Sequence, residues 1–493
     1  MEKMRIAIVY PPLPSEKGVP LLSQNRQFQW FSRPTYIFPV VPATAATMLK
    51  NAGHDILWLD GIAEELSPEE FDKKLVDFTP DYIVLETKTP VVKRHWKWIS
   101  DHKSGGIANA KFVIVGDHVT AMPEETMENS PVDFILTGGD WDFLLKNIVS
   151  ALDDESQYEP GIWYRSQGVV KNTGRFQLNH DLKLTPWIDR DLCKWRLYSV
   201  KNGNFRRTPG TYLMSGRDCW HAKCTFCSWT TLYPSYRTRD PIDVVDEIEY
   251  LVKEYGVKEI MDDSGSFPVG TFMEKFCEEM IRRGLNKKVR IDCNMRFGRL
   301  GPADYRLMKK AGFRLVLFGV ESANQITLDR FVKALKVEDI EKGAKWASEA
   351  GLDVHLTFMF GHAWEGREEI ANTVELARRM LAKGYASTLQ CTLTIPYPGT
   401  PLFNELKAAD GLSSLDWDDY DMRKAITKTP FVTEEEIKCA IRDVYRGFLQ
   451  PEALLRRLTS TRTLFDFTFY YRGIRSLVGH LVDFRGIKGK KGN

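Results

Sequence analysis

The sequence predicts an α/β protein with two series of alternating strands and helices, joined by an irregular connector. Three observations support this fold class. The chain has 493 residues, more than the roughly 100–200 residues of one domain. Short apolar runs of β type alternate with helical stretches in both halves. Between residues 151 and 205 the alternation gives way to polar residues, glycines and scattered aromatics.

Residues 1–150 predict a doubly wound, Rossmann-like sheet, since strands that alternate with helices form parallel sheets. The strand-like runs are Arg5–Tyr10, Ile56–Leu59, Tyr82–Leu85, Phe112–Val115 and Phe134–Leu136. A helix over Thr44–Asn51 is expected to end at Gly53, because glycine commonly follows a helix C-terminus. Ligands of such sheets bind beyond the carboxyl ends of the strands. The residues at those ends are Pro11, Glu86–Thr89, Gly116–His118 and Thr137–Gly139.

Residues 206–404 hold six strand-plus-helix units, which predict a partial (β/α)6 barrel of the TIM type with its active site at the C-terminal strand ends. The expected strands are Thr211–Met214, Glu259–Met261, Arg290–Asn294, Leu315–Gly319, Val354–Phe360 and Thr388–Ile395. The expected helices are Ile242–Tyr255, Thr271–Arg283, Ala303–Ala311, Val337–Ala350 and Ile370–Lys383. Residues 151–205 are expected to connect the two units with a little β structure, and residues 405–493 to be mainly helical.

Composition narrows the class of protein. Lys and Arg number 68 against 66 Asp and Glu, so the net charge of +2 argues against a nucleic-acid-binding face. No stretch approaches the roughly 18–20 apolar residues of a transmembrane helix. The N-terminus has an acidic Glu2 and a short apolar run, which resembles a first strand and not a signal peptide. We therefore expect a cytoplasmic protein. The aromatic Leu464–Tyr471 and the basic tail are expected either to pack, to cap the barrel or to contact a membrane.

Three of the eight cysteines crowd into one loop after the first barrel strand. Cys219, Cys224 and Cys227 have the spacing C-x4-C-x2-C. Three thiolates on a short loop can bind three irons of a 4Fe-4S cluster and leave the fourth iron open for a small molecule. The alternative is a structural zinc ion with His221 or a distant residue as fourth ligand. The place of the loop, above a barrel strand, favours a catalytic cluster.

The loop resembles that of the radical S-adenosylmethionine (SAM) superfamily, whose usual spacing is C-x3-C-x2-C; the extra residue before Cys224 departs from it. Five later segments resemble that superfamily in the same order. They read EIMDDSGSF, RIDCNMRFGR, FGVES, VHLTFMFGHAWEG and IPYPGTP. The resemblance implies a SAM site, and the residues assigned to it are Phe226, Asp262 or Asp263, Arg296, Glu321, Gly361 and Tyr397. Lys333 stands where relatives often carry lysine.

The first 150 residues resemble the cobalamin-binding domain of the anaerobic magnesium-protoporphyrin ester cyclases and cobalamin-dependent methylases. The resemblance rests on the RIAIVYPP start, AATMLKNAGHDILWLD, GDHVTAMPEET and VDFILTGGDWDFLLKNI. The residues assigned to cobalamin are Pro11, Thr87, Thr89, Gly116, His118 and Gly138. The D-x-H-x-x-G sequence of His-ligated cobalamin proteins is absent. Relatives of this kind bind cobalamin without that histidine, or keep the domain without the cofactor, and both alternatives remain open.

The activity implied by the resemblance is reductive cleavage of SAM to methionine and a 5′-deoxyadenosyl radical, with the protein orienting and shielding the reaction. Cobalamin-dependent methylation of an unactivated carbon is favoured. Cyclisation, oxidation or C–C coupling on a lipid or tetrapyrrole without cobalamin is the first alternative. A zinc- or cobalamin-binding regulator without enzyme activity is the second. The expected partners are a small-molecule substrate and an electron donor such as flavodoxin or ferredoxin.

Overall fold

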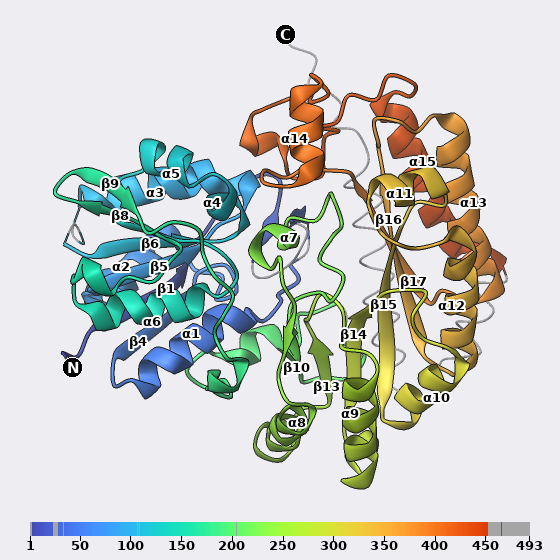
Figure 1. Cartoon of the computed structure of the whole chain (residues 1–493), viewed down its shortest axis with the longest axis horizontal. Coiled ribbons are helices and arrows are strands. Elements are labelled where there is room, and N and C mark those ends of the chain that lie inside the picture. The colour runs from blue at the N-terminus through green and yellow to red at the C-terminus, as the bar shows by residue number, and fades with distance from the viewer. Residues whose placement is uncertain are drawn as a thin grey trace.

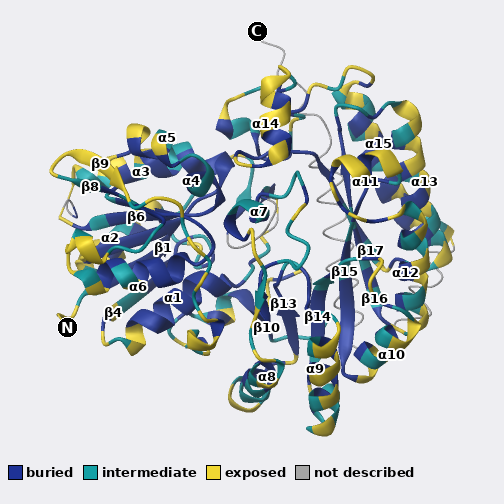
Figure 2. Cartoon of the chain, in the orientation of Figure 1, coloured by how far each residue is buried: buried dark blue, intermediate teal, exposed yellow. Residues whose placement is uncertain are grey.

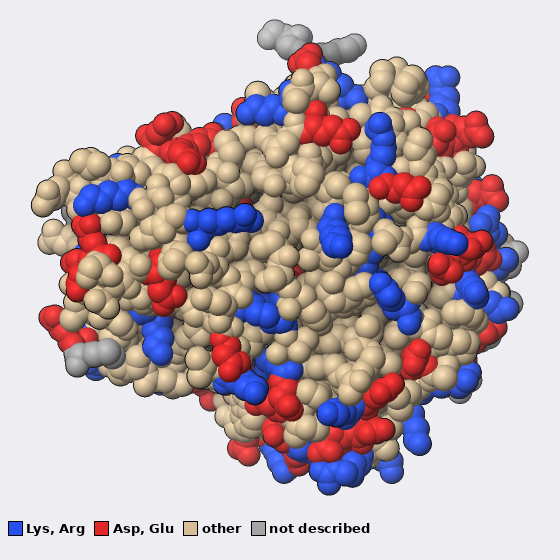
Figure 3. Space-filling view, viewed as in Figure 1, with Lys and Arg blue, Asp and Glu red and all other residues tan. Residues whose placement is uncertain are grey.

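The fold was analysed in a computed structural model that describes residues 2–22, 28–32, 34–105, 107, 109–203, 205–451 and Phe465. Two sheets with flanking helices lie side by side, the first at the left of Figure 1 and the second curving through the right half. The α/β class predicted from the sequence is confirmed. Acidic and basic side chains are interspersed over the face in Figure 3, as the nearly balanced charge implies.

The first sheet has the order β4-β1-β5-β6-β7-β8-β9, and its first five strands are parallel. The strands are β1 (Arg5–Tyr10), β4 (Asp55–Asp60), β5 (Tyr82–Glu86), β6 (Lys111–Val115), β7 (Phe134–Leu136), β8 (Ile162–Ser166) and β9 (Val169–Asn172). The order of the parallel strands is that of flavodoxin-like sheets, in which the ligand binds where the winding direction reverses. That point lies between β1 and β5.

The helices beside this sheet include one that starts earlier than the sequence pattern suggested. They are α1 (Val40–Asn51), α2 (Pro68–Phe78), α3 (Val92–Lys103), α4 (Asp117–Ala121), α5 (Pro123–Asn129) and α6 (Trp141–Ala151). Helix α1 begins at Val40 although we predicted Thr44, because Pro42 falls in the first turn, where a missing N–H leaves no hydrogen bond unmade. The strands β2 (Val19–Leu21) and β3 (Gln29–Phe31) form a hairpin between β1 and α1 that we did not predict.

The expected connector contributes to the first sheet. Strands β8 and β9 form a hairpin whose β8 pairs with β7 in antiparallel direction. The little β structure predicted between residues 151 and 205 is therefore an extension of the front sheet, and it covers an edge that β7 would otherwise leave unpaired.

The second sheet has the order β10-β13-β14-β15-β16-β17, with every pair parallel. Its strands are β10 (Gly210–Leu213), β13 (Glu259–Asp262), β14 (Arg290–Met295), β15 (Phe313–Glu321), β16 (Asp353–Phe360) and β17 (Thr388–Leu393). The helices between them are α8 (Pro241–Tyr255), α9 (Thr271–Arg282), α10 (Pro302–Lys310), α11 (Gln325–Arg330), α12 (Val337–Glu349) and α13 (Arg367–Lys383). The sheet curves without pairing β17 to β10 in the described part of the chain, as a partial barrel does (Figure 1).

The chain after the barrel is described as far as residue 451, and again at Phe465. Helices α14 (Pro401–Ala408) and α15 (Glu434–Arg446) are separated by a mostly irregular stretch with one short helical turn, Trp417–Asp419. Leu464–Tyr471 and the basic tail lie outside the described residues, apart from Phe465. Among the helices that the structure describes, none has both the length and the apolar character to cross a membrane.

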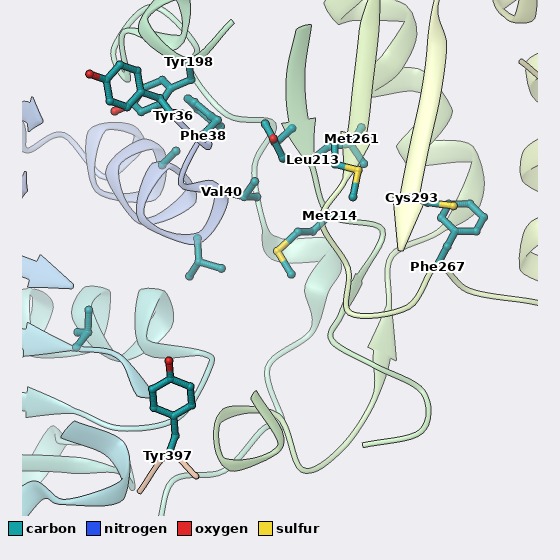
Figure 4. Close-up of a cluster of buried hydrophobic side chains, with 14 of the residues drawn as sticks. Tyr36, Phe38, Val40, Tyr198, Leu213, Met214, Met261, Phe267, Cys293 and Tyr397 are labelled. Carbon is teal, nitrogen blue, oxygen red and sulfur yellow. The ribbon is translucent and has the colours of Figure 1, made fainter. Parts of the chain in front are cut away.

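One hydrophobic core runs through both sheets. In Figure 4, Tyr36, Phe38 and Val40 of the front unit approach Leu213 and Met261 of the barrel. Figure 2 shows the central strands of both sheets buried, and β9 and the outer helix faces exposed. This shared core makes the relative position of the two sheets part of the folded structure, so a site between them can use side chains from both.

Candidate active site

The three cysteines lie on a segment that leaves the barrel sheet and returns to it. Strand β11 (Gly216–Arg217) directly precedes the segment, β12 (Arg237–Thr238) directly follows it, and the two pair in antiparallel direction. Between them lies the short helix α7 (Trp229–Leu232). Cys224 is buried, and Cys219 and Cys227 are half-buried. We call residues 218–236 the cysteine segment.

The cysteine segment is held over the C-terminal ends of the barrel strands by hydrogen bonds to the loop after α11. The Thr225 amide donates to the Phe331 carbonyl at 3.1 Å, and Nε2 of His221 donates to the Val332 carbonyl at 2.6 Å. The Leu402 amide at the start of α14 donates to the Thr225 carbonyl at 3.0 Å. The segment therefore lies where catalytic groups of such barrels gather.

Two cations lie beside Cys224. The Nη1 atom of Arg296 is 3.6 Å from the Cys224 sulfur, and Nη2 donates to the Lys333 carbonyl. Burial raises the pKa of the Cys224 thiol, while the nearby charges of Lys333 and Arg296 act in the opposite direction. A thiolate is the form that binds metal, and nearby cations stabilise it. The site therefore suits a metal-bound thiolate at position 224.

Glu321 and Lys333 form a buried ion pair next to these groups. Their Oε1 and Nζ atoms are 2.7 Å apart, and the side chains are only 8% and 5% exposed. Nζ of Lys333 also donates to the Gly319 carbonyl at 2.7 Å and lies 6.0 Å from the centre of the Phe226 ring. The sequence-predicted residues Phe226, Arg296 and Glu321 are thus brought together with Cys224.

Several buried donors around the cysteine segment have no acceptor among the described residues. They are Nε1 of Trp220, the hydroxyls of Ser228 and Tyr236, and Nε of Arg296. Trp220 and Ser228 directly follow Cys219 and Cys227 in the chain. Native proteins pair nearly all buried polar groups, so a concentration of unpaired donors indicates a bound group rich in acceptors. A 4Fe-4S cluster with SAM carries sulfides and a carboxylate, and it fits this donor set.

A single zinc ion fits the segment less well. Among the residues that the structure describes, no three Cys, His, Asp or Glu side chains converge as ligands of one metal ion. His221, the local candidate for a fourth ligand, instead donates to a backbone carbonyl. A 4Fe-4S cluster with one open iron needs only three thiolates from the protein and no fourth side-chain ligand.

The two adjacent carboxylates predicted for SAM differ in their surroundings. Asp262 is buried, and its carboxylate accepts hydrogen bonds from the Ser215 hydroxyl and, at 3.0 Å, from the Ser264 amide. Burial raises the pKa of Asp262, partly offset by these bonds. Its side chain ties the end of β10 to the end of β13. Asp263 follows it directly, and its amide donates to the Leu213 carbonyl at 2.8 Å.

Two other residues predicted for the SAM site, Gly361 and Tyr397, lie beside elements other than the cysteine segment. Gly361 follows β16 with φ +87°, a conformation that favours glycine, and a methyl group there would lie 3.6 Å from Ile437 of α15. The Tyr397 hydroxyl donates to the Tyr420 carbonyl at 3.3 Å. Burial raises the pKa of Tyr397, with the carboxylate of Asp117 in the front unit adding to the effect. Tyr397 thus lies where the end of β17 meets the front sheet.

Most residues assigned to cobalamin meet at the carboxyl edge of the front sheet. Thr89 Oγ1 is 3.1 Å from Nδ1 of His118, and the Gly138 amide donates to Thr120 at 3.0 Å. A methyl group on Gly116 would lie 2.2 Å from the Thr87 carbonyl oxygen, so these two loops touch. His118 is fully buried, and its Nε2 is 3.5 Å from Glu125.

Sequence reasoning did not single out Lys88, which lies at the same edge. Its side chain is 4% exposed, and Nζ is 3.7 Å from Asp117, too far for a hydrogen bond. The ammonium lies 5.3 Å from the centre of the Trp229 ring, two residues after Cys227. A charged residue two positions after a buried strand was the signal in the sequence. Lys88 shows that the edge of the front sheet meets the cysteine segment.

Comparison with known proteins agrees with this geometry. Residues 213–377 match the model of the radical SAM superfamily. This part of the chain is a radical SAM domain. The protein is an enzyme that uses a 4Fe-4S cluster and SAM, which confirms the class predicted from the sequence.

Two curated relatives of this radical SAM protein align with most of the chain. An uncharacterised methyltransferase of Pyrococcus horikoshii is 28% identical over 440 residues, which are 85% of this chain and 89% of the relative. The anaerobic magnesium-protoporphyrin IX monomethyl ester cyclase of Cereibacter sphaeroides is 29% identical over 419 residues, 82% of this chain and 66% of the cyclase.

Solved structures share the fold of both units. One is TsrM from Kitasatospora setae, a radical SAM methyltransferase with cobalamin and a 4Fe-4S cluster bound. The superposition includes 98% of this chain and all of TsrM, with a TM-score of 0.68 and 14% sequence identity. Another is OxsB, a cobalamin-dependent radical SAM enzyme. The superposition includes 98% of this chain and 72% of OxsB, with a TM-score of 0.69 and 16% sequence identity. The predicted pairing of a B12-type front domain with a radical SAM barrel is therefore confirmed as a fold.

The buried Glu321–Lys333 pair yields a stability prediction. Lys333→Met should lower the free energy of unfolding by about 3–5 kcal/mol, because it leaves a carboxylate buried without its partner. The double variant Glu321→Gln with Lys333→Met should regain much of this loss. Lys73→Met, which breaks an exposed pair with Asp77, should have almost no effect. Denaturant unfolding checks the series, and equal losses for Lys333→Met and Lys73→Met would contradict the buried pair.

Proposed function

We propose that this radical SAM enzyme methylates a carbon atom of a small molecule with cobalamin bound at its front sheet. The observation that carries the proposal is the contact between the two proposed sites: Lys88, at the edge of the front sheet, lies against Trp229 of the cysteine segment. Several curated relatives are named methyltransferases, among them a bacteriochlorophyllide d C-8(2)-methyltransferase of Chlorobaculum tepidum, 27% identical over 34% of this chain. TsrM and OxsB, which share the fold, hold cobalamin.

In this proposal Cys219, Cys224 and Cys227 would hold a 4Fe-4S cluster, with SAM beside it. The bound cluster supplies the electron for reductive cleavage of SAM. Arg296 and Lys333 stabilise the Cys224 thiolate, as their positions beside its sulfur favour. Glu321, fixed by Lys333, orients polar groups of SAM, and the packed segment excludes water from them.

We assign the contact with the SAM ammonium group to Asp263. Asp262 is the last residue of β13 and Asp263 follows it; the carboxylate of Asp262 accepts hydrogen bonds from Ser215 and Ser264. A charge-assisted bond from an ammonium is strong enough to position the ligand. Asp262 then acts beneath the site by holding two strand ends together.

Cobalamin, when bound, would supply the methyl group. Its proposed site is the carboxyl edge of the front sheet, lined by Thr87, Thr89 and the Gly116 and Gly138 loops. The fit rests on the switch point between β1 and β5 and on the buried Lys88 ammonium, which is paired with Asp117 at 3.7 Å without a hydrogen bond. His118 is held by Thr89, Glu125 and Trp417, so we propose that it does not bind cobalt.

The second candidate is cyclase chemistry without cobalamin. It is favoured by the magnesium-protoporphyrin ester cyclases, which match 82% and 85% of this chain. A tetrapyrrole or a lipid is the substrate class that these relatives and the hopanoid C-3 methylase of Methylococcus capsulatus suggest. An electron donor such as flavodoxin or ferredoxin would serve either reaction.

The cluster is tested by anaerobic purification and reconstitution with iron and sulfide. Wild type should bind about four irons and sulfides, as a 4Fe-4S cluster requires, and form 5′-deoxyadenosine from SAM under reduction. Cys224→Ala should lose the cluster and the product. Cys277→Ala removes another buried cysteine, on α9, and should retain both. Zinc without iron in the wild type, or equal losses in both variants, would refute the proposal.

Cobalamin is tested separately by growth with the vitamin and extraction from the purified protein. We expect about one cobalamin per chain, with a Co(II) electron paramagnetic resonance (EPR) spectrum that does not depend on His118. His118→Phe should leave that spectrum unchanged. A chain that binds the cluster but no cobalamin would favour the cyclase alternative, and nitrogen splitting lost in His118→Phe would overturn the coordination proposed here.

A further inference from the structure

Two aspartates of the front unit bind the base of the cysteine segment. Asp140 stands at the N-cap of α6, where an aspartate usually accepts from its own helix, yet its side chain makes no capping bond. It accepts instead from both terminal nitrogens of Arg237, each at 2.7 Å, and from Arg217 at 3.1 Å. Asp142, in the first turn of α6, accepts from Nη1 and Nη2 of Arg217 at 2.8 and 2.5 Å.

The two arginines flank the cysteine segment: Arg217 directly precedes it and Arg237 directly follows it. Arg217 and Arg237 are direct partners in the β11–β12 ladder. Like charges directly opposite each other destabilise such a ladder. Since the ladder has only two residues on each strand, it has little other hydrogen bonding to offset this repulsion. The carboxylates of Asp140 and Asp142 therefore supply the counter-charge that allows the segment to close.

The charges are buried and closely packed. The side chains of Arg217, Asp140 and Asp142 are 6%, 2% and 0% exposed. His180 adds a bond from Nδ1 to Asp140 at 3.2 Å and stacks on Phe143 with ring centres 4.3 Å apart. Burial by itself would raise the pKa of Asp140, but the bonds from His180 and Arg237 and the charge of Arg217 hold it well below its usual range. The carboxylate is thus ionised at neutral pH.

The same front-unit loop also contacts the far part of the segment. The Gly139 amide donates to the Leu232 carbonyl at 3.0 Å, and the Tyr233 hydroxyl donates to the Gly139 carbonyl at 2.8 Å. A methyl group on Gly139 would lie 2.0 Å from the Tyr233 ring, so only glycine permits this approach. Gly138, one residue earlier, belongs to the edge at which we place cobalamin. One loop therefore borders that edge and anchors the segment at its base and at α7.

We propose that Asp140 and Asp142 are positioning residues that hold the cysteine segment in its ligand-binding conformation from the front unit. This proposal depends on the proposed function in one respect: it takes the cysteine segment to be the site of the 4Fe-4S cluster. Without the two carboxylates, the paired arginines repel each other and the base of the segment opens. The barrel contacts at Phe331 and Val332 then hold the segment at one side only.

Hydrogen–deuterium exchange of the full chain, with and without reconstituted cluster, tests the proposal. In Asp140→Asn and Asp142→Asn, amides of residues 218–236 should exchange roughly tenfold faster or more, because local opening sets the exchange rate. Peptides of β13 to β16 should keep the wild-type rate. Asp353→Asn breaks a partly buried pair with Arg206 and Arg314 at the start of the barrel strands and should leave residues 218–236 protected. The double variant Asp142→Asn with Arg217→Gln should regain protection.

The loaded protein adds a readout that general destabilisation does not produce. The EPR spectrum of the reduced cluster should change in Asp140→Asn and Asp142→Asn and stay as in wild type in Asp353→Asn. Exchange within twofold of wild type in both aspartate variants would overturn the proposal, as would equal acceleration by Asp353→Asn. A wild type that takes up no iron, with accelerated exchange in the aspartate variants, would refute the cluster and leave the positioning role supported.

Discussion

The cysteine segment depends on contacts with two separate sheets, because it has little regular structure of its own. Its one helix has four residues, and its ladder has two residues on each strand. Carbonyls of the loop after α11 accept its hydrogen bonds on the barrel side, and Asp140 and Asp142 neutralise its paired arginines on the other. A segment ordered in this way requires the continuous core that fixes one sheet against the other.

The charged side chains around the cysteine segment can be buried together because opposite charges lie next to each other. A cluster bound by three thiolates is electron-rich, and Arg296 and Lys333 lie on the side of the segment where such a group would bind. Glu321 offsets the charge of Lys333 at 2.7 Å, as Asp142 offsets that of Arg217. Arg296, Lys333 and Arg217 therefore each have a thiolate or carboxylate partner, which avoids the cost of an unpaired charge in the interior.

Much of the fold and part of the site could be predicted from the sequence, because their signals are local. Strand runs such as Arg5–Tyr10 and Tyr82–Glu86 are mostly apolar in themselves, and six parallel barrel strands in order bring their C-terminal ends to one edge. Cys224, Arg296 and Glu321 each follow or end such a strand, and the structure brings them together. Tyr397 follows the last strand, but it packs toward the front unit, a direction that strand order does not determine.

The pairing of Asp140 and Asp142 with Arg217 and Arg237 could not be predicted in the same way. More than 70 residues separate Asp142 from Arg217, and an aspartate before a helix is locally indistinguishable from an ordinary N-cap. Its role follows only from how the front sheet meets the barrel. The same holds for Lys88, which becomes an interior charge because Trp229 of the cysteine segment covers it. The residues that escape sequence reasoning here are those that join the two sheets, and a site shared between two sheets is where such residues control the geometry.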